Sequence, residues 1–221
     1  LHDIQDHDSV SWHHCSKLTY PSLIAKKLNL EYYCTALPGQ GNKVIADDII
    51  RAVLCHGNNM FYLINWTWID RFEYMGEARC GKAHGWESTL PGKNNTQSEF
   101  YYKYFHNDLD SKLSSLMYIN TALEILCDHN CEFIMTNTDN LLFDKTYHCS
   151  SVIDYLQNKI SPYMDSFNGD NFLTWSRKNK FSESNHWHPL EEAHEAAAEY
   201  WLPKVRTLLN SSAKEESHAF K

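Results

Sequence analysis

The sequence predicts a doubly wound α/β domain, in which a parallel sheet carries helices on both faces. Two observations indicate this class. Segments with apolar residues at helical spacing alternate with strand-like segments, and short crossovers join them. The most apolar strand-like segment is the continuous run Met60 to Ile64, which is typical of a strand buried in a parallel sheet. Because no internal repeat or linker interrupts the 221 residues, we expect a single domain over residues 1–221.

Each element follows from a local pattern. The expected helices have apolar residues three and four positions apart and cover 20–28, 43–55, 111–126, 152–157 and 189–209. The first helix has Thr19 as its N-cap and Pro21 in its first turn, and Pro203 is expected to kink the last one. The expected strands cover 30–36, 60–64 and 132–136. We expect residues 70–98 to be a loop insertion and the polar tail from 211 to fray.

Charge and cysteine usage exclude some functional classes. Lys and Arg total 20 and Asp and Glu total 28, so the net charge of −8 argues against a duplex nucleic-acid binder. The most apolar stretch, Met60 to Trp68, is about half the ~20 residues that a membrane-spanning helix needs. The seven cysteines contain no CxxC pair and no scaffold-like spacing, which favours free thiols in a reducing compartment. With no basic segment followed by an apolar one at the start, we expect a cytoplasmic protein.

The stretch from Asn185 to His194 is the most informative for chemistry. His188 stands directly before a helix that begins with Pro189, where a loop can hold an imidazole in a cleft, and Asn185 is spaced to orient its ring. This is the pattern of a general base with its partner. His188 could equally pack against the helix or cap it. A third alternative is a metal site formed by His186, His188 and His194, but no carboxylate or cysteine cluster completes it, and we expect no metal.

Two further turns could bind a ligand. Leu37 to Asn42 joins a strand to a helix, and Gly39 there would let a backbone N–H approach a ligand oxygen, although a plain tight turn is the simpler interpretation. The pattern is neither a dinucleotide fingerprint nor a P-loop. Asn65 or Thr67, at the end of the apolar strand, could donate a side-chain hydrogen bond.

The residues around these turns have simpler interpretations. The charged residues Asp70, Arg71 and Glu73 could pair with one another. The aromatic run 100–105 could stack sugars or bases but is more typical of core packing.

Taken in order, these segments resemble the SGNH (GDSL-type) hydrolase superfamily, and within it a small phage- and bacterium-encoded branch. Residues 20–28 resemble the first helix of the family, and Cys34 to Gly39 with Gln40-Gly41-Asn42 resembles its glycine turn. Phe61 to Glu73 resembles the third block, and Asn185, His188-Pro189 and His194 resemble the last. The resemblance implies a flavodoxin-like fold.

The resemblance also implies acyl-ester hydrolysis. Ser9 would attack the carbonyl, His188 would accept its proton, and Asn185 would stand where the family has Asp; the oxyanion would be bound by Ser9, Gly39 and either Asn65 or Thr67. The substrate would be a small-molecule or glycan ester, with no cofactor, nucleic acid or membrane involved. His7-Asp8-Ser9 follows a polar segment, so the first strand and its serine could instead lie upstream of residue 1. The alternative function is a non-catalytic binding or structural module of the same fold, such as a phage protein.

Overall fold

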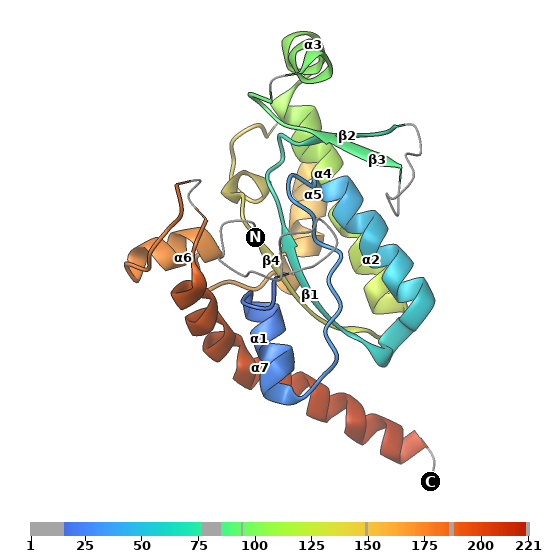
Figure 1. The fold of residues 1–221 in the computed structure, drawn as a ribbon. Helices are drawn as coiled ribbons and strands as arrows, with labels where there is room; N and C mark the ends of the chain where they lie inside the picture. The colour runs from blue at the N-terminus through green and yellow to red at the C-terminus, as the bar shows by residue number, and fades with distance from the viewer. Residues whose placement is uncertain (1–15, 77–84, 94, 149, 186–187, 220–221) are drawn as a thin grey trace. The chain divides into compact units, whose positions relative to one another are not determined.

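The computed structural model describes residues 16–76, 85–93, 95–148, 150–185 and 188–219, with side chains as far as 211. It is a mixed α/β protein (Figure 1). Its α-helices are α1 (Tyr20–Leu28), α2 (Asn42–His56), α3 (Thr96–Tyr104), α4 (Asp108–Asp128), α5 (Ser151–Ile160), α6 (Phe172–Lys178) and α7 (Glu191–Ala219). Its strands are β1 (Phe61–Trp66), β2 (Phe72–Met75), β3 (Trp86–Thr89) and β4 (Glu132–Asn137). Short 3-10 helices cover Gly57–Asn59, Asn140–Leu142 and Ser161–Tyr163.

The described residues divide into two compact units. The first unit contains residues 16–38, 61–63 and 166–219, and the second contains 39–60 and 64–165. No helix within the described residues combines the length and the apolar character that crossing a bilayer requires.

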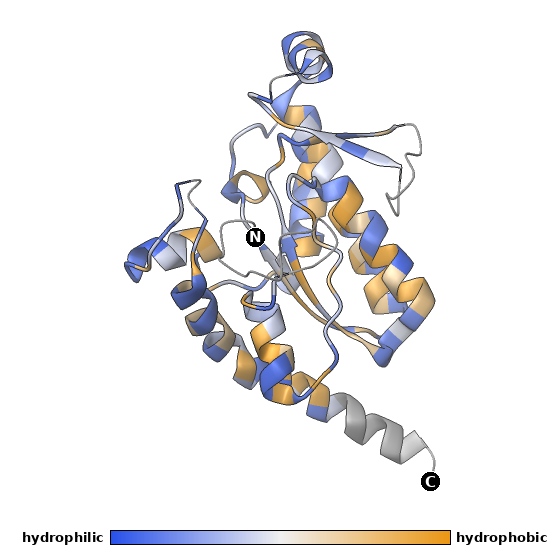
Figure 2. Cartoon of the chain, in the orientation of Figure 1, coloured by the Kyte–Doolittle hydropathy of each residue, from blue (hydrophilic) through white to orange (hydrophobic). Residues whose placement is uncertain are grey.

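The second unit contains β4 and residues 64–66 of its partner strand β1. The two strands form a parallel sheet, and the pairing continues beyond β1 because the Thr138 N–H donates to the Trp66 carbonyl at 2.8 Å. Helices α2 and α4 pack against each other, and α4 also packs against α5. Apolar positions recur along α2 and α4 and are drawn orange in Figure 2. The core of this unit contains these fully buried side chains: Leu116, Ile119, Leu126, Ile134, Leu142, Ile153 and Ile160. Burial of these side chains stabilises the unit by the hydrophobic effect.

Part of the expected loop insertion at 70–98 is a β-hairpin. Strands β2 and β3 pair antiparallel, with Phe72 opposite Thr89 and Met75 opposite Trp86. The sequence signal was weak because each strand has only four residues. Helix α3 follows, and its N-cap Asn95 accepts a hydrogen bond from the Ser98 N–H at 2.8 Å.

The aromatic run 100–105 is less buried than core packing predicts. Phe100, Tyr104 and Phe105 are 56%, 61% and 64% exposed, and their rings contact one another. Only Tyr101 and Tyr102 turn toward the hairpin, where Tyr101 stacks on Phe72. The short α3 offers one packed face, so the remaining aromatic rings stay at the surface.

The first unit contains α1, α6 and α7, and its core is aromatic. Helices α1 and α7 pack together, and the fully buried ring of Phe167 contacts Tyr20, Phe172, Trp175 and Trp201. α7 contains Pro203 and continues to Ala219, past the end predicted at residue 209.

The strand predicted at 30–36 is wrong. Residues 30–37 adopt no regular structure, and Leu30 and Tyr33 are 45% and 70% exposed. This strand-like segment has no partner strand in the described part of the chain, and a strand without a partner leaves its backbone groups unpaired. In the described residues the parallel sheet has two strands, so the wider doubly wound sheet stays a prediction.

Candidate functional site

The predicted glycine turn leads directly into α2. Gly39 has φ +79°, in the left-handed region that glycine adopts at little cost, and a side chain here would be strained. The Gly39 N–H donates no hydrogen bond to any described part of the chain. Its N–H is therefore a backbone donor with no acceptor among the described residues, and the predicted role in ligand binding stays a prediction.

Asn42, the first residue of α2, joins this turn to the end of β1. Its side-chain oxygen accepts the Thr67 N–H at 2.8 Å, and its amide nitrogen donates to the Thr67 carbonyl at 3.2 Å and to Ser115 Oγ at 3.1 Å. Asn42 is 3% exposed. One buried amide thus fixes the backbone of Thr67 on both sides and ties it to α2 and α4.

Glu73 caps the N-terminus of α2. The N-cap residue is Gly41, which has no side chain to satisfy the first N–H groups of the helix. The Glu73 carboxylate takes that place by accepting the N–H groups of Gly41 at 2.6 Å and Val44 at 2.9 Å, as well as the Ser88 hydroxyl at 3.0 Å. Burial raises the pKa of Glu73 above its ordinary value, and these three hydrogen bonds oppose the rise.

Gly41 allows this cap to form. A Cβ at position 41 would lie 2.8 Å from the Glu73 carboxyl group and 3.1 Å from Arg71 Cβ. The close approach of the backbone to the carboxylate therefore requires glycine here.

Arg71 binds the same turn from the other side. Its Nη1 donates to the Gln40 carbonyl at 2.6 Å. Burial lowers the pKa of Arg71, and the charges of Asp70 and Glu73 oppose the change. The sequence left open a pairing among Asp70, Arg71 and Glu73, but none of the three forms an ion pair within the described residues. The arginine and the glutamate bind the backbone around α2 instead.

The two candidate oxyanion side chains differ in their surroundings. Asn65 is exposed, and its amide is already bonded to Thr138 Oγ1 and Thr136 Oγ1, both at 2.9 Å. Thr67 is buried, and its hydroxyl has no hydrogen-bond partner in the described residues. Thr67 therefore has the freer donor of the two.

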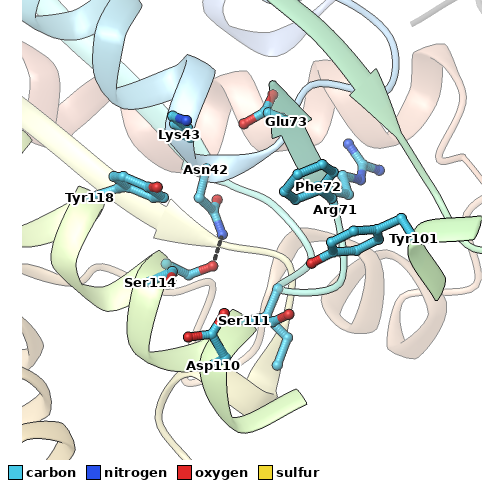
Figure 3. Close-up of a pocket in the computed structure, with 12 residues that line it drawn as sticks. Asn42, Lys43, Arg71, Phe72, Glu73, Tyr101, Asp110, Ser111, Ser114 and Tyr118 are labelled. Atoms are coloured by element: carbon cyan, nitrogen blue, oxygen red, sulfur yellow. Dashed lines mark hydrogen bonds between the residues drawn. The ribbon is translucent and has the colours of Figure 1, made fainter. Parts of the chain in front are cut away.

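A cavity of about 260 Å³ lies in the second unit beside these residues (Figure 3). Its wall is formed by the start of α2, the segment entering β2, α3 and one face of α4. Of the residues above, Asn42, Arg71, Glu73 and Ser115 line it; Gly39, Asn65 and Thr67 do not. The sequence did not predict this cavity, since its wall comes from four separate segments.

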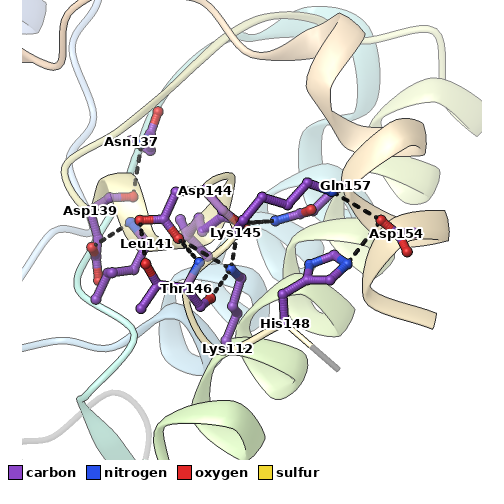
Figure 4. Close-up of polar contacts among 11 residues, drawn as sticks. Lys112, Asn137, Asp139, Leu141, Asp144, Lys145, Thr146, His148, Asp154 and Gln157 are labelled. Atoms are coloured by element: carbon purple, nitrogen blue, oxygen red, sulfur yellow. Dashed lines mark hydrogen bonds and ion pairs between the residues drawn. The ribbon is translucent and has the colours of Figure 1, made fainter. Parts of the chain in front are cut away.

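A second polar cluster fixes the segment after β4 (Figure 4). The fully buried Lys112 donates to the carbonyls of Asp144 at 2.9 Å and Thr146 at 2.7 Å, and its Nζ lies 3.5 Å from Asp144 Oδ1. Gln157 donates to the Leu142 carbonyl at 2.7 Å. Burial lowers the pKa of Lys112, and the charge of Asp144 opposes the change. Because Lys112 donates to two backbone carbonyls, we interpret the cluster as structural.

Asp139 attaches this segment to the exit of β1. Its two carboxylate oxygens accept the N–H groups of Ile69 at 3.0 Å and Leu141 at 2.9 Å. The side chain is 3% exposed. The carboxylate thus holds the segments that follow β1 and β4 together.

His188 and Asn185 lie in the first unit, on the loop before α7. Both are exposed. The loop is closed by Ser184, whose N–H donates to the His188 carbonyl at 2.9 Å and whose hydroxyl accepts the His188 N–H at 3.2 Å. Asn185 forms no hydrogen bond in the described chain, so the predicted contact with the His188 ring is not seen. Ser184, one residue earlier, closes the turn instead.

His194 has a structural role rather than that of a ligand. Its Nδ1 accepts the Tyr20 N–H at 3.1 Å, which satisfies a donor at the start of α1, where the side chain of the N-cap Thr19 accepts no hydrogen bond from the helix. The ring is 8% exposed, and burial lowers the pKa of His194 to about 4. The described residues contain no cluster of three potential metal ligands. Two members of the predicted sites, Ser9 and His186, lie outside the described residues.

Comparison with protein-family models, with curated proteins and with solved structures gave no significant match. The assignment of a function therefore depends on the residues and their geometry.

Proposed function

We propose that this chain is a serine hydrolase of the SGNH type, with a flavodoxin-like fold, that cleaves acyl esters. Ser9 Oγ attacks the carbonyl carbon while His188 accepts its proton, and the proton then passes to the departing alcohol. Water hydrolyses the resulting acyl-enzyme by the same route in reverse. The oxyanion is bound by backbone N–H groups of Ser9 and Gly39 and by a side chain at the end of β1. Thr67 is the better candidate for that side chain, with Asn65 as the alternative.

One observation supports this proposal: the glycine turn and the segment that follows β1, two of the segments that resemble the family, are hydrogen-bonded to each other. Residues 39–44 and 65–73 are far apart in the sequence, yet Asn42, Arg71 and Glu73 join them through five hydrogen bonds. Among the residues that the structure describes, the Gly39 N–H and the Thr67 hydroxyl of this joined segment have no hydrogen-bond partner. Donors held rigidly before the reaction are what oxyanion stabilisation requires.

Hydrolysis of p-nitrophenyl acetate tests the nucleophile and the base. We expect Ser9→Ala to reduce turnover to the uncatalysed rate and His188→Ala to reduce it about 10²- to 10⁴-fold, the usual contribution of a general base. Ser182→Ala and His56→Ala change an exposed serine and an exposed histidine and serve as matched controls. Equal rates for the wild type and His188→Ala would exclude His188 as the base.

A substitution at Asn185 tests the proposal by an expected increase in kcat. An amide can orient an imidazole but cannot stabilise imidazolium by charge, and loss of that charge is costly in serine hydrolases. We therefore expect Asn185→Asp to raise kcat about tenfold or more, measured with the same ester. An unchanged or lower kcat would show that residue 185 does not act on the base.

A non-catalytic module of the same fold is the second candidate. It is favoured by the lack of a hydrogen bond at Asn185 within the described part of the chain. If the wild type, Ser9→Ala and Asn185→Asp all fail to hydrolyse activated esters, this candidate replaces the first.

A further inference from the structure

The cavity of the second unit has polar groups that the protein itself does not use. Arg71 donates only from Nη1, to Gln40, so its Nε and Nη2 have no acceptor among the described residues. The carboxylate of Asp110, in the first turn of α4, likewise has no hydrogen bond or ion pair in the described residues. The Tyr118 hydroxyl is also without a partner there. Arg71, Asp110 and Tyr118 all line this one cavity (Figure 3).

The formal charges of the cavity wall balance. Lys43 and Arg71 oppose Glu73 and Asp110. Glu73 is fully used by the α2 cap, and the Lys43 ammonium lies 4.6 Å from the centre of the Trp86 ring. An anion would meet two carboxylates and a cation would meet two basic groups. The balance favours a neutral ligand with many hydroxyl groups.

The rest of the wall combines three aromatic rings with Asn42, Ile69 and the serines Ser111, Ser114 and Ser115. Phe72 and Tyr101 stack with their ring centres 3.8 Å apart, and Tyr118 adds a ring from α4. A volume of about 260 Å³ is just below the ~300–1,000 Å³ of common ligand sites, so the ligand must be small. Aromatic faces together with a carboxylate and a guanidinium suit a ring with C–H groups on its faces and hydroxyls on its rim.

We propose that this cavity is a binding site for a single pyranose sugar unit. Asp110 accepts hydrogen bonds from two sugar hydroxyls, Arg71 donates to a hydroxyl or the ring oxygen, and the rings of Tyr101 and Tyr118 contact the C–H faces. No residue assigned to the hydrolytic chemistry lines this cavity. The inference therefore does not depend on the proposed function.

Binding of monosaccharides to the full chain tests the site. Saturation-transfer NMR and calorimetric titration with D-glucose, D-galactose and N-acetyl-D-glucosamine should show millimolar binding of at least one of them. Asp110→Asn should weaken this binding about tenfold or more, since hydrogen bonds to a charged acceptor are stronger than those to a neutral amide. Tyr118→Phe should weaken it about threefold or more. Asp128→Asn, at the exposed end of the same helix and outside the cavity, should bind as the wild type does.

Three results would overturn the proposal: no binding of any of the three sugars, binding that Asp110→Asn and Tyr118→Phe leave unchanged, or tighter binding of inorganic phosphate than of the sugars. Circular dichroism of both variants excludes misfolding as the cause of lost binding. The test is separable from hydrolysis, because His188→Ala should bind the sugar as the wild type does even if no ester is cleaved.

Discussion

Replacing Asn42 with alanine should lower the free energy of unfolding by about 3 kcal/mol. The substitution removes three hydrogen bonds, two of them to the backbone of Thr67. Thr67 is buried, so its N–H is left without a partner, and a buried unsatisfied donor or acceptor costs about 1–3 kcal/mol. Urea unfolding followed by circular dichroism measures the change.

The control for this variant is Asn58→Ala. Asn58 is exposed and its side chain forms no hydrogen bond in the described structure, so we expect a change within about 0.5 kcal/mol. If Asn42→Ala unfolds at the same urea concentration as Asn58→Ala, the hydrogen bonds of Asn42 to Thr67 and Ser115 do not stabilise the fold. In the proposed hydrolase, Asn42→Ala should also reduce kcat, because it loosens Thr67.

Elements with strong local signals were predicted from the sequence. α1 agrees with its predicted range, since Pro21 favours its start and Asn29, in the left-handed conformation, ends it. α2 and α4 agree within a few residues because their apolar positions recur at helical spacing and face a core. β1 and β4 were predicted for a similar reason, as compact apolar runs.

The elements that were missed depend on tertiary contacts. α6 has only seven residues, and its place is fixed by Trp175, which packs on Phe167 from a different segment. At 30–36 the sequence predicted an element that the structure lacks. A segment of strand-like composition forms a strand only if another strand pairs with it.

In the candidate site, too, residues with a local signal could be predicted and residues that depend on tertiary contacts could not. Gly39 and Thr67 could be selected because a glycine after a strand-like segment and a polar residue at a strand end are local signals. The role of Glu73 could not be predicted. The sequence shows a carboxylate near an arginine, but it does not show that Glu73 accepts the Gly41 N–H at a helix whose N-cap residue has no side chain. Such a cap is identified only when the partner segment, 32 residues away, is placed beside it.

Acid should destabilise this protein through His194. Burial lowers the pKa of His194 to about 4, from an ordinary value of 6.5, so the folded state holds the ring neutral. Its neighbours are the rings of Tyr20 and Phe172, with centres 6.0 and 5.0 Å away. The neutral Nδ1 accepts the Tyr20 N–H, and protonation would replace that acceptor with a second donor. The unfolded chain binds this proton more readily than the folded one.

The pH range follows from these two pKa values. The contribution of His194 to stability is complete above pH 6.5 and decreases as the pH falls toward the folded pKa, with a loss of about 3 kcal/mol at pH 4. The variant His194→Gln keeps an acceptor oxygen that can reach Tyr20 but does not titrate. Urea unfolding at pH 7 and pH 4 should therefore show a smaller loss for His194→Gln than for the wild type, by about 3 kcal/mol.

His56→Gln is the matched control, since it removes an exposed histidine and leaves the bond between Tyr20 and His194 in place. It should keep the acid sensitivity of the wild type. If His194→Gln loses as much stability on acidification as the wild type does, the ring is protonated in the folded state without cost. In that case the carboxyl groups, rather than His194, cause the loss of stability at low pH.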